Sequence, residues 1–186
     1  MKTHQSKISL AGVGTLLIVL TIAARCRADA PTTQPTAFTP GGIATTNNPT
    51  DMAIQGNGFF QVSLHGRIAY TRFGAAIVNN VGELVIGFGD GCQFVPPLRV
   101  PPITSAKQIF IGEDGVIAVR DTKDGKNILV GQIQLATFAD PSKLKPLGAT
   151  FYQPTAASGQ PVFRTPGQHG AGILLQGFIE QPLSGI

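Results

Sequence analysis

Residues 46–64 read TNNPTDMAIQGNGFFQVSL, and this stretch decides the fold of the chain. Residues 52–54 (MAI) predict a short strand, and Gly56-Asn57-Gly58 offers the positive φ angles that a tight hairpin turn needs. From residue 59 to residue 64 apolar and polar side chains alternate, which is typical of a half-buried strand with Phe60, Val62 and Leu64 on its inner face. The stretch therefore predicts two short strands joined in a hairpin.

Turns of the same kind punctuate the chain after this stretch, beginning with His65-Gly66. Apolar runs between them predict strands at residues 67–73, 75–78, 83–86, 98–100, 109–111, 116–120 and 128–138, and residues 170–180 carry the last apolar run. Short strands at this spacing predict an all-β domain, either a sandwich or a barrel-like sheet. Within the longest candidate, 128–138, Ile133 and Leu135 fall on one face.

A single segment, residues 141–147, has the residues of a short helical turn. Asp140 can act as its N-cap, and Pro141 suits the first helical position. Pro146 limits the length of the segment to about one or two helical turns. The predicted fold class is therefore mainly β with one short helical turn.

The N-terminal residues 1–30 have the pattern of a secretory signal peptide. A basic start is followed by an almost continuous apolar run at residues 8–24, a signal-like helix, and by Ala28-Asp29-Ala30 as a cleavage site. An uncleaved membrane anchor is the alternative, since the run reaches the lower limit of spanning length. A lipoprotein is disfavoured because Arg25 precedes Cys26. Residues 31–46 are a Pro/Thr-rich linker, residues 47–181 the β-domain and residues 182–186 a tail.

Charge and cysteine content exclude several classes of protein. Residues 1–30 hold four of the 14 basic residues and one of the 10 acidic residues, so the net charge of +4 falls to +1 for the rest of the chain. With no basic stripe, nucleic-acid binding is not expected. After cleavage Cys92 would be the only cysteine, so we expect a small packing residue, or alternatively a reactive or intermolecular thiol.

No pattern of residues predicts catalysis or a metal site. His65 and His169 sit in predicted turns outside any nucleophile motif, and no histidine or cysteine pair has the spacing of metal ligands. Residues 113–115 and 121–125 resemble fragments of calcium loops but lack the alternating ligands and the final glutamate. We therefore predict no catalytic, cofactor-binding or metal-binding residues.

Two further patterns are better explained as turns between strands than as a phosphate-binding or catalytic site. Residues 87–91 (GFGDG) lack the Lys-Ser/Thr of a phosphate loop and do not open a helix. The carboxylates Asp51, Glu83, Asp90 and Glu180 sit in turns or at strand ends, and nothing in the sequence pairs two of them for acid–base work. What remains is surface for contact. Phe59, on the face opposite Phe60, and Phe88 and Phe94, near loops, are core residues or interface residues, and edge strands offer unpaired backbone groups.

Three separated phrases resemble the flagellar basal-body rod and hook proteins, most of all the distal-rod members. The first is residues 46–64, quoted above. The second is residues 130–140 (VGQIQLATFAD), which continue with Pro141, Leu144 and Gly148, and the third is residues 164–181 (RTPGQHGAGILLQGFIEQ). Three intervening hairpins, at residues 70–72, 80–85 and 112–119, fit the same pattern, so the resemblance covers residues 45–181.

The resemblance implies a structural protein that acts through protein–protein contacts with other rod or hook subunits or with itself. It implies no catalysis, no cofactor and no small-molecule substrate, and a place in the basal body or periplasm. Members of the family also pair one helix before the β-domain with a second helix after it, and this chain shows no apolar heptad repeat at either place. The alternative is a secreted or membrane-tethered β-domain that serves as a binding module outside the flagellum, and a truncated gene product is also open.

Overall fold

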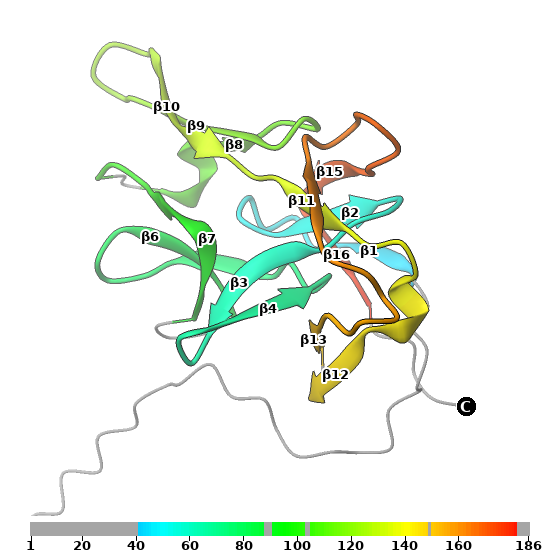
Figure 1. Ribbon diagram of the computed structural model, residues 1–186. Coiled ribbons are helices and arrows are strands. Elements are labelled where there is room, and N and C mark those ends of the chain that lie inside the picture. The colour runs from blue at the N-terminus through cyan, green and yellow to red at the C-terminus, as the bar shows by residue number, and fades with distance from the viewer. Residues whose placement is uncertain (1–40, 88–90, 103–104, 149, 182–186) are drawn as a thin grey trace, which may run out of the picture.

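The computed structural model describes residues 41–87, 91–102, 105–148 and 150–181 (Figure 1). Within them the fold is built from sixteen strands and two short 3-10 turns, so the prediction of a mainly β protein is confirmed. The expected leader, most of the expected linker and the expected tail lie outside the described residues. In the described part of the chain no helix is long and apolar enough to cross a membrane.

The largest sheet has seven antiparallel strands in the order β12-β13-β4-β3-β7-β6-β5. Its strands are β3 (Phe60–Leu64), β4 (Arg67–Thr71), β5 (Ala76–Val78), β6 (Glu83–Ile86), β7 (Cys92–Arg99), β12 (Lys145–Gly148) and β13 (Phe151–Gln153). In β3 the alternation predicted from sequence is confirmed, since Phe60, Val62 and Leu64 are buried. The β3–β4 hairpin turns at His65-Gly66, both with positive φ, as expected for a two-residue loop.

A second sheet of three strands, in the order β10-β9-β8, packs at one end of the molecule (Figure 1). It contains β8 (Ile109–Ile111), β9 (Val116–Arg120) and β10 (Asn127–Gln132). Three antiparallel pairs complete the fold: β1 (Ile43–Thr45) with β16 (Phe178–Glu180), β2 (Met52–Gln55) with β15 (Ile173–Gln176), and β11 (Leu135–Thr137) with β14 (Val162–Arg164). β1 thus lies inside the segment expected to be a linker.

One continuous apolar core joins these sheets. Its buried residues come from the large sheet, the three-stranded sheet and the β2–β15 pair, for example Phe60, Leu84, Ile117 and Leu174. A second, smaller cluster lies on the other face of the large sheet and contains Phe59, Tyr70, Ala136 and Leu144. Because Phe59 and Phe60 are adjacent and point to opposite faces, the start of β3 connects the two clusters.

The predicted hairpin between residues 52–54 and 59–64 is wrong, although both strands exist. β2 pairs with β15, while β3 pairs with β4 and β7. Gly56 and Gly58 do adopt the expected positive φ angles of 107° and 131°. Their carbonyl oxygens, however, accept hydrogen bonds from Arg72. The glycine-rich turn therefore carries the chain from one sheet to another instead of closing a hairpin.

The long strand expected at residues 128–138 is two strands that belong to different sheets. β10 ends at Gln132 and pairs with β9, whereas β11 begins at Leu135 and pairs with β14. Between them the Ile133 N–H donates to the Gly115 carbonyl oxygen at 2.9 Å, which redirects the chain. Ile133 and Leu135 are both buried, as expected.

The segment expected at residues 98–100 belongs to a longer strand, β7, that runs through Pro96-Pro97. Pairing with β6 jumps from Leu98 opposite Leu84 to Gln93 opposite Val85. The residues between Gln93 and Leu98 are therefore left out of that ladder, and a bulge of this kind accommodates prolines, which lack an N–H to donate.

Both 3-10 turns are capped by a polar side chain at their start. The turn η2 (Pro141–Lys143) confirms the first half of the helical segment predicted at residues 141–147, and the Asp140 Oδ1 caps it by accepting from the Ser142 N–H at 3.0 Å. The second half is wrong, because residues 145–147 belong to β12. A second turn, η1 (Ala106–Gln108), was not predicted. Its signal is a capping box, in which Ser105 accepts from the Lys107 N–H and Gln108 accepts from the Ser105 N–H.

Candidate interaction site

The residues weighed for catalysis lie apart in the structure. His65 is in the β3–β4 turn, and His169 lies in the turn before β15, each with a positive φ. Among the described residues no group of three or more His, Cys, Asp or Glu side chains is placed to hold a metal ion. Both histidines are therefore turn residues.

The acidic residues of the calcium-like fragments form turns. The Asp121 Oδ1 accepts from the Lys123 N–H at 2.8 Å, and the Asp124 Oδ1 accepts from the Lys126 N–H at 3.0 Å. In the other fragment, the Asp114 Oδ1 accepts from the Val116 N–H at 3.1 Å. Each carboxylate thus replaces a backbone acceptor in a turn, which is the common role of Asp at such positions.

The described carboxylates that were weighed as a catalytic pair have separate partners. Asp51 accepts from the Asn48 side chain and from the Ala76 N–H. Glu83 forms an ion pair with Arg99, and its other oxygen accepts from Gln93 at 2.6 Å. Glu180 is bound to Arg72, while Asp90 and most of the 87–91 loop lie outside the described residues. No two of these carboxylates are brought together.

The phenylalanines weighed as core or interface are core residues where the structure describes them. Phe59 packs edge to face against Phe138 and Tyr152, with ring centroids 5.7 and 5.9 Å apart. Phe60 packs in the same way against Phe94, at 5.9 Å. All of these lie in the two clusters, whereas Phe88 is outside the described residues.

Cys92 is also a core residue, but it is not a lone thiol. Its side chain is fully buried, and its sulfur takes part in a disulfide bond. The expectation of a single unpaired cysteine is therefore wrong; it rested on removal of residues 1–30, where the chain's other cysteine lies.

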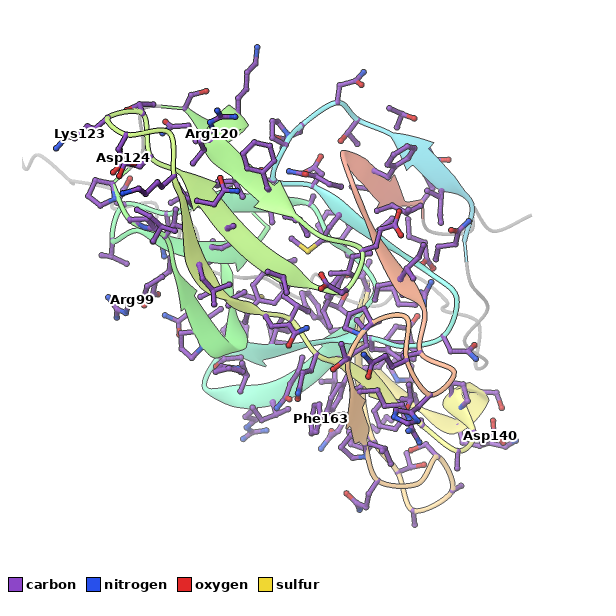
Figure 2. The ribbon with its side chains drawn as sticks, turned by 90° about the horizontal axis from the view of Figure 1, so that it is seen from above. Arg99, Arg120, Lys123, Asp124, Asp140 and Phe163 are labelled. Atoms are coloured by element: carbon purple, nitrogen blue, oxygen red, sulfur yellow. The ribbon has the colours of Figure 1, made fainter. Side chains whose placement is uncertain are left out.

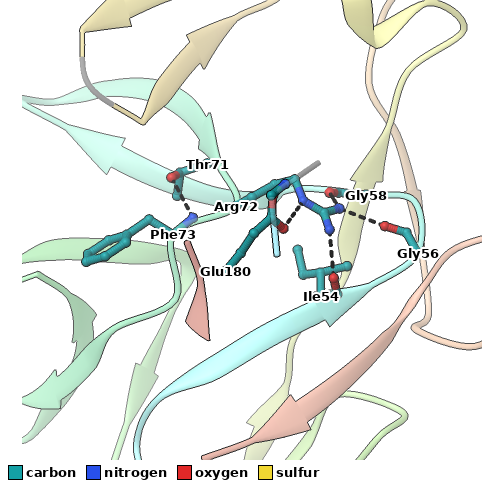
Figure 3. Close-up of polar contacts among 8 residues, drawn as sticks. Ile54, Gly56, Gly58, Thr71, Arg72, Phe73 and Glu180 are labelled. Carbon is teal, nitrogen blue, oxygen red and sulfur yellow. Dashed lines mark hydrogen bonds and ion pairs between the residues drawn. The ribbon is translucent and has the colours of Figure 1, made fainter. Parts of the chain in front are cut away.

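A buried ion pair, which the sequence did not reveal, joins four separate segments. The Arg72 Nε donates to Glu180 Oε2 at 2.5 Å, and its other nitrogens donate to the carbonyl oxygens of Ile54, Gly56 and Gly58 (Figure 3). The second oxygen of Glu180 accepts from the Gly41 N–H at 2.9 Å. The sequence offers one signal for the burial of Arg72. It follows Tyr70 by two residues, and residues two apart along an extended chain lie on the same face.

A polar pocket of about 410 Å³ lies beside this ion pair. Three segments form its walls: the β2–β3 connection at residues 56–59, residues 137–139 with Pro141, and the turn at His169-Gly170. The side chains of Arg72 and Arg164 complete the lining. Arg164 comes from β14 and donates through Nε to the Thr137 Oγ1 at 3.3 Å. The pocket is thus lined by two arginines and by no acidic residue.

An apolar stripe on the three-stranded sheet is the other surface suited to contact. Phe110, Ala118 and Leu129 lie opposite one another on β8, β9 and β10. Their neighbours Ile109, Ile111 and Ile117 point into the core, so the stripe is on the outer face, where Phe110 is 45% and Leu129 70% exposed. β10 is also an edge strand of its sheet. Exposed apolar surface at a strand edge favours association with another chain.

The chain is similar to flagellar proteins over most of its described residues. Residues 53–119 match a family model described as the flagellar hook protein FlgE/F/G D1 domain. The flagellar basal-body rod protein FlgG of Buchnera aphidicola from Acyrthosiphon pisum is 41% identical over 143 residues, which are 76% of this chain and 54% of that relative.

Rod proteins of two other bacteria are similar to the chain over comparable lengths. The FlgG of Borreliella burgdorferi is 35% identical over 144 residues, covering 77% of this chain and 54% of the relative. The FlgG of Bacillus subtilis is 33% identical over 150 residues, covering 78% and 55%. The chain therefore spans about half the length of the relatives it matches.

Proposed function

We propose that this chain is a structural component of the bacterial flagellar basal body, of the distal-rod type, because most of its sequence is similar to flagellar basal-body rod proteins. One observation carries the proposal: the similarity to rod proteins extends far beyond the residues matched by the family model. On this proposal the described strands form a β-domain of the rod and hook type.

The proposed mode of action is contact with other subunits, without catalysis or a cofactor. The partners are other rod or hook subunits, or further copies of this chain. Two features support this mode: the carboxylates of Asp51, Glu83 and Glu180 are occupied by structural hydrogen bonds and ion pairs, and the outer face of the three-stranded sheet leaves apolar area exposed. Association with a neighbour is favoured because covering this apolar area removes it from water.

The proposed location is the basal body where it crosses the periplasm. The apolar run at residues 8–24 supports export, either as a cleaved signal or as an anchor in the inner membrane. A chain exported in this way would reach the rod from the periplasmic side.

Mass spectrometry of purified hook–basal bodies tests the proposal. The chain is expressed in its native host, and its peptides are counted in basal bodies and in the periplasmic and membrane fractions of the same cells. Enrichment in basal bodies is the expected result, and the N-terminal peptide distinguishes a cleaved signal, with a start at or near Pro31, from a retained anchor. Peptides confined to the periplasm or membrane would instead support the alternative, a secreted or tethered binding module outside the flagellum.

A surface variant sharpens the same experiment. Phe110→Ser combined with Leu129→Ser removes the apolar stripe while leaving the inward-facing isoleucines intact, so we expect a folded protein that is depleted from basal bodies. Val81→Ser is the matched control, because Val81 is 68% exposed in the β5–β6 turn of the other sheet. Unchanged incorporation of the double variant would place the subunit contact elsewhere on the domain.

A further inference from the structure

The pocket beside the Arg72–Glu180 ion pair contains a positive charge that the described residues do not neutralise. Arg164 is only partly exposed, and its one hydrogen bond is to a neutral hydroxyl, that of Thr137. Within residues 41–181, as far as they are described, no acidic side chain forms an ion pair with Arg164. A partly buried guanidinium without a counter-charge is a ready site for an anion, because charge-assisted hydrogen bonds are among the strongest that proteins form.

The second arginine of the pocket is already compensated. Arg72 is 6% exposed, is paired with Glu180 and donates to three carbonyl oxygens. It therefore shapes the pocket by fixing the walls at Gly56 and Gly58, and it leaves Arg164 as the group that would meet a ligand.

Asp140 is close in sequence to the pocket residues, but its carboxylate has another partner. Asp140 lies between two residues that line the pocket, but its Oδ1 accepts from the backbone N–H and the hydroxyl of Ser142. A ligand that enters the pocket thus meets Arg164 without an acidic side chain among the lining residues to repel it.

The surroundings of Arg164 suit an extended peptide. β14 pairs with β11 along one edge, and within the described residues its other edge has no strand beside it. Val162 shares a face of β14 with Arg164, and Val162 and Phe163 are 49% and 42% exposed. Figure 2 shows Phe163 and Asp140 toward one end of the molecule, away from Arg120, Lys123 and Asp124. An added strand can use the open edge and cover these apolar side chains.

We propose that this pocket binds the carboxylate of an Asp or Glu side chain from an extended segment of a partner protein, with Arg164 as the recognising cation. The guanidinium presents two parallel N–H groups to the two carboxylate oxygens, and the apolar residues of β14 contact the flanking residues of the segment. This site does not depend on the partner being a rod subunit, so this proposal and the proposed function fail separately.

Titration of the isotope-labelled full chain, followed by NMR, tests the site. The probes are the peptide acetyl-Val-Glu-Val-amide, its Gln counterpart and free succinate. We expect the Glu peptide to shift the Arg164 side-chain signal and the backbone signals of residues 56–58, 137–139 and 169–170. The Gln peptide should bind about tenfold more weakly or worse, since hydrogen bonds to charged groups exceed neutral ones by about that margin.

Each remaining outcome decides a part of the proposal. Equal binding of the Glu and Gln peptides, or no shift at these residues, overturns the carboxylate site. Succinate binding as tightly as the Glu peptide overturns the peptide source and assigns the site to a free small acid.

Two variants assign the role to Arg164. Arg164→Gln should abolish the response and Arg164→Lys should weaken it, because lysine cannot make the bidentate contact. The matched control, Arg120→Gln, removes an exposed arginine that lies outside the pocket and should bind as the wild type does. A folded Arg164→Gln variant with wild-type affinity would show that another group recognises the acid.

Discussion

At the scale of single residues, the buried pair of Arg72 and Glu180 holds together parts of the chain that are far apart in sequence. The two residues are separated by 108 positions, and their hydrogen bonds also reach Gly41 and the β2–β3 connection. Pairs of this kind add little net stability compared with apolar residues, but removing one partner leaves a buried charge unsatisfied.

We therefore expect Glu180→Ala to lower the free energy of unfolding by about 3–5 kcal/mol, which is the usual cost of an orphaned buried charge. Urea denaturation of the two proteins measures this difference. The control is Lys126→Ala, which breaks an exposed ion pair with Asp124 and should cost no more than about 1 kcal/mol. Similar losses in the two variants would mean that the Arg72–Glu180 pair is solvated in solution.

A second prediction at this scale concerns pH. Burial raises the pKa of the Tyr70 hydroxyl above its ordinary value of 10.0. The folded state therefore holds this proton more tightly than the unfolded state, so the contribution of Tyr70 to stability is complete below pH 10 and is lost as the pH rises through the folded-state pKa.

Tyr70→Phe removes that ionisation, so the stability of the variant should fall less steeply than that of the wild type above pH 10. Free energies of unfolding measured from pH 8 to pH 11 provide the test, and the difference between the two curves isolates Tyr70 from the lysines. Burial and the charge of Glu180 also raise the pKa of Tyr152, and both proteins share this effect. Parallel curves over the whole range would contradict the prediction.

At the scale of elements, the sequence shows which residues form strands and turns but not which strands are neighbours. Alternation identified the buried face of β3, and Asp140 and Pro141 identified η2. A period of two, however, is equally compatible with any partner strand. The β2–β15 pairing joins residues about 120 positions apart, and only tertiary contacts select it.

The same limit explains why the candidate site was missed. Arg72 follows β4 of the large sheet, whereas Arg164 ends β14, which belongs to a different sheet. The pocket between them exists only because Gly56 and Gly58 turn the chain from β2 to β3. The residue types gave a correct local prediction, since both glycines have positive φ. The glycine-rich turn was predicted to close a hairpin because nothing in the sequence indicates that its carbonyl oxygens accept hydrogen bonds from Arg72.

This connection supports a prediction at the element scale. At Gly58 the φ angle is 131°, and an added Cβ would lie 2.9 Å from the Cβ of Leu135. Gly58→Ala should therefore destabilise the fold through both backbone strain and a clash, by about 1–3 kcal/mol or more.

Gly66→Ala is the matched control for this substitution. Its φ is also positive, at 76°, but an added Cβ meets no atom within 4 Å. The control should thus lose only the backbone term, of about 1–2 kcal/mol. Thermal unfolding of both variants ranks the two losses, and a smaller loss for Gly58→Ala would show that the connection adjusts to a side chain.

At the scale of the whole molecule, the sheets share one core, and β3 links that core to the second cluster through Phe59 and Phe60. A chain whose sheets have no separate cores is expected to unfold in a single cooperative step. The protein offers a convenient test, because it has no tryptophan and both of its tyrosines lie in or against the second cluster.

Tyrosine fluorescence therefore reports on the second cluster, while far-ultraviolet circular dichroism reports on all the strands. We expect the two signals to give the same midpoint in guanidinium chloride. An earlier fluorescence transition would mean that the second cluster and the β11–β14 pair unfold as an independent unit.

The β1–β16 pair determines how the domain responds to a mechanical load. Because Ile43 lies opposite Glu180, the chain enters and leaves the described domain at neighbouring points. A force that draws the two flanking segments apart would open the hydrogen bonds of β1 and β16 one after another, as a zip opens. A force that pulls both segments in the same direction puts no tension across the hydrogen bonds between β1 and β16. The domain then moves as one rigid body.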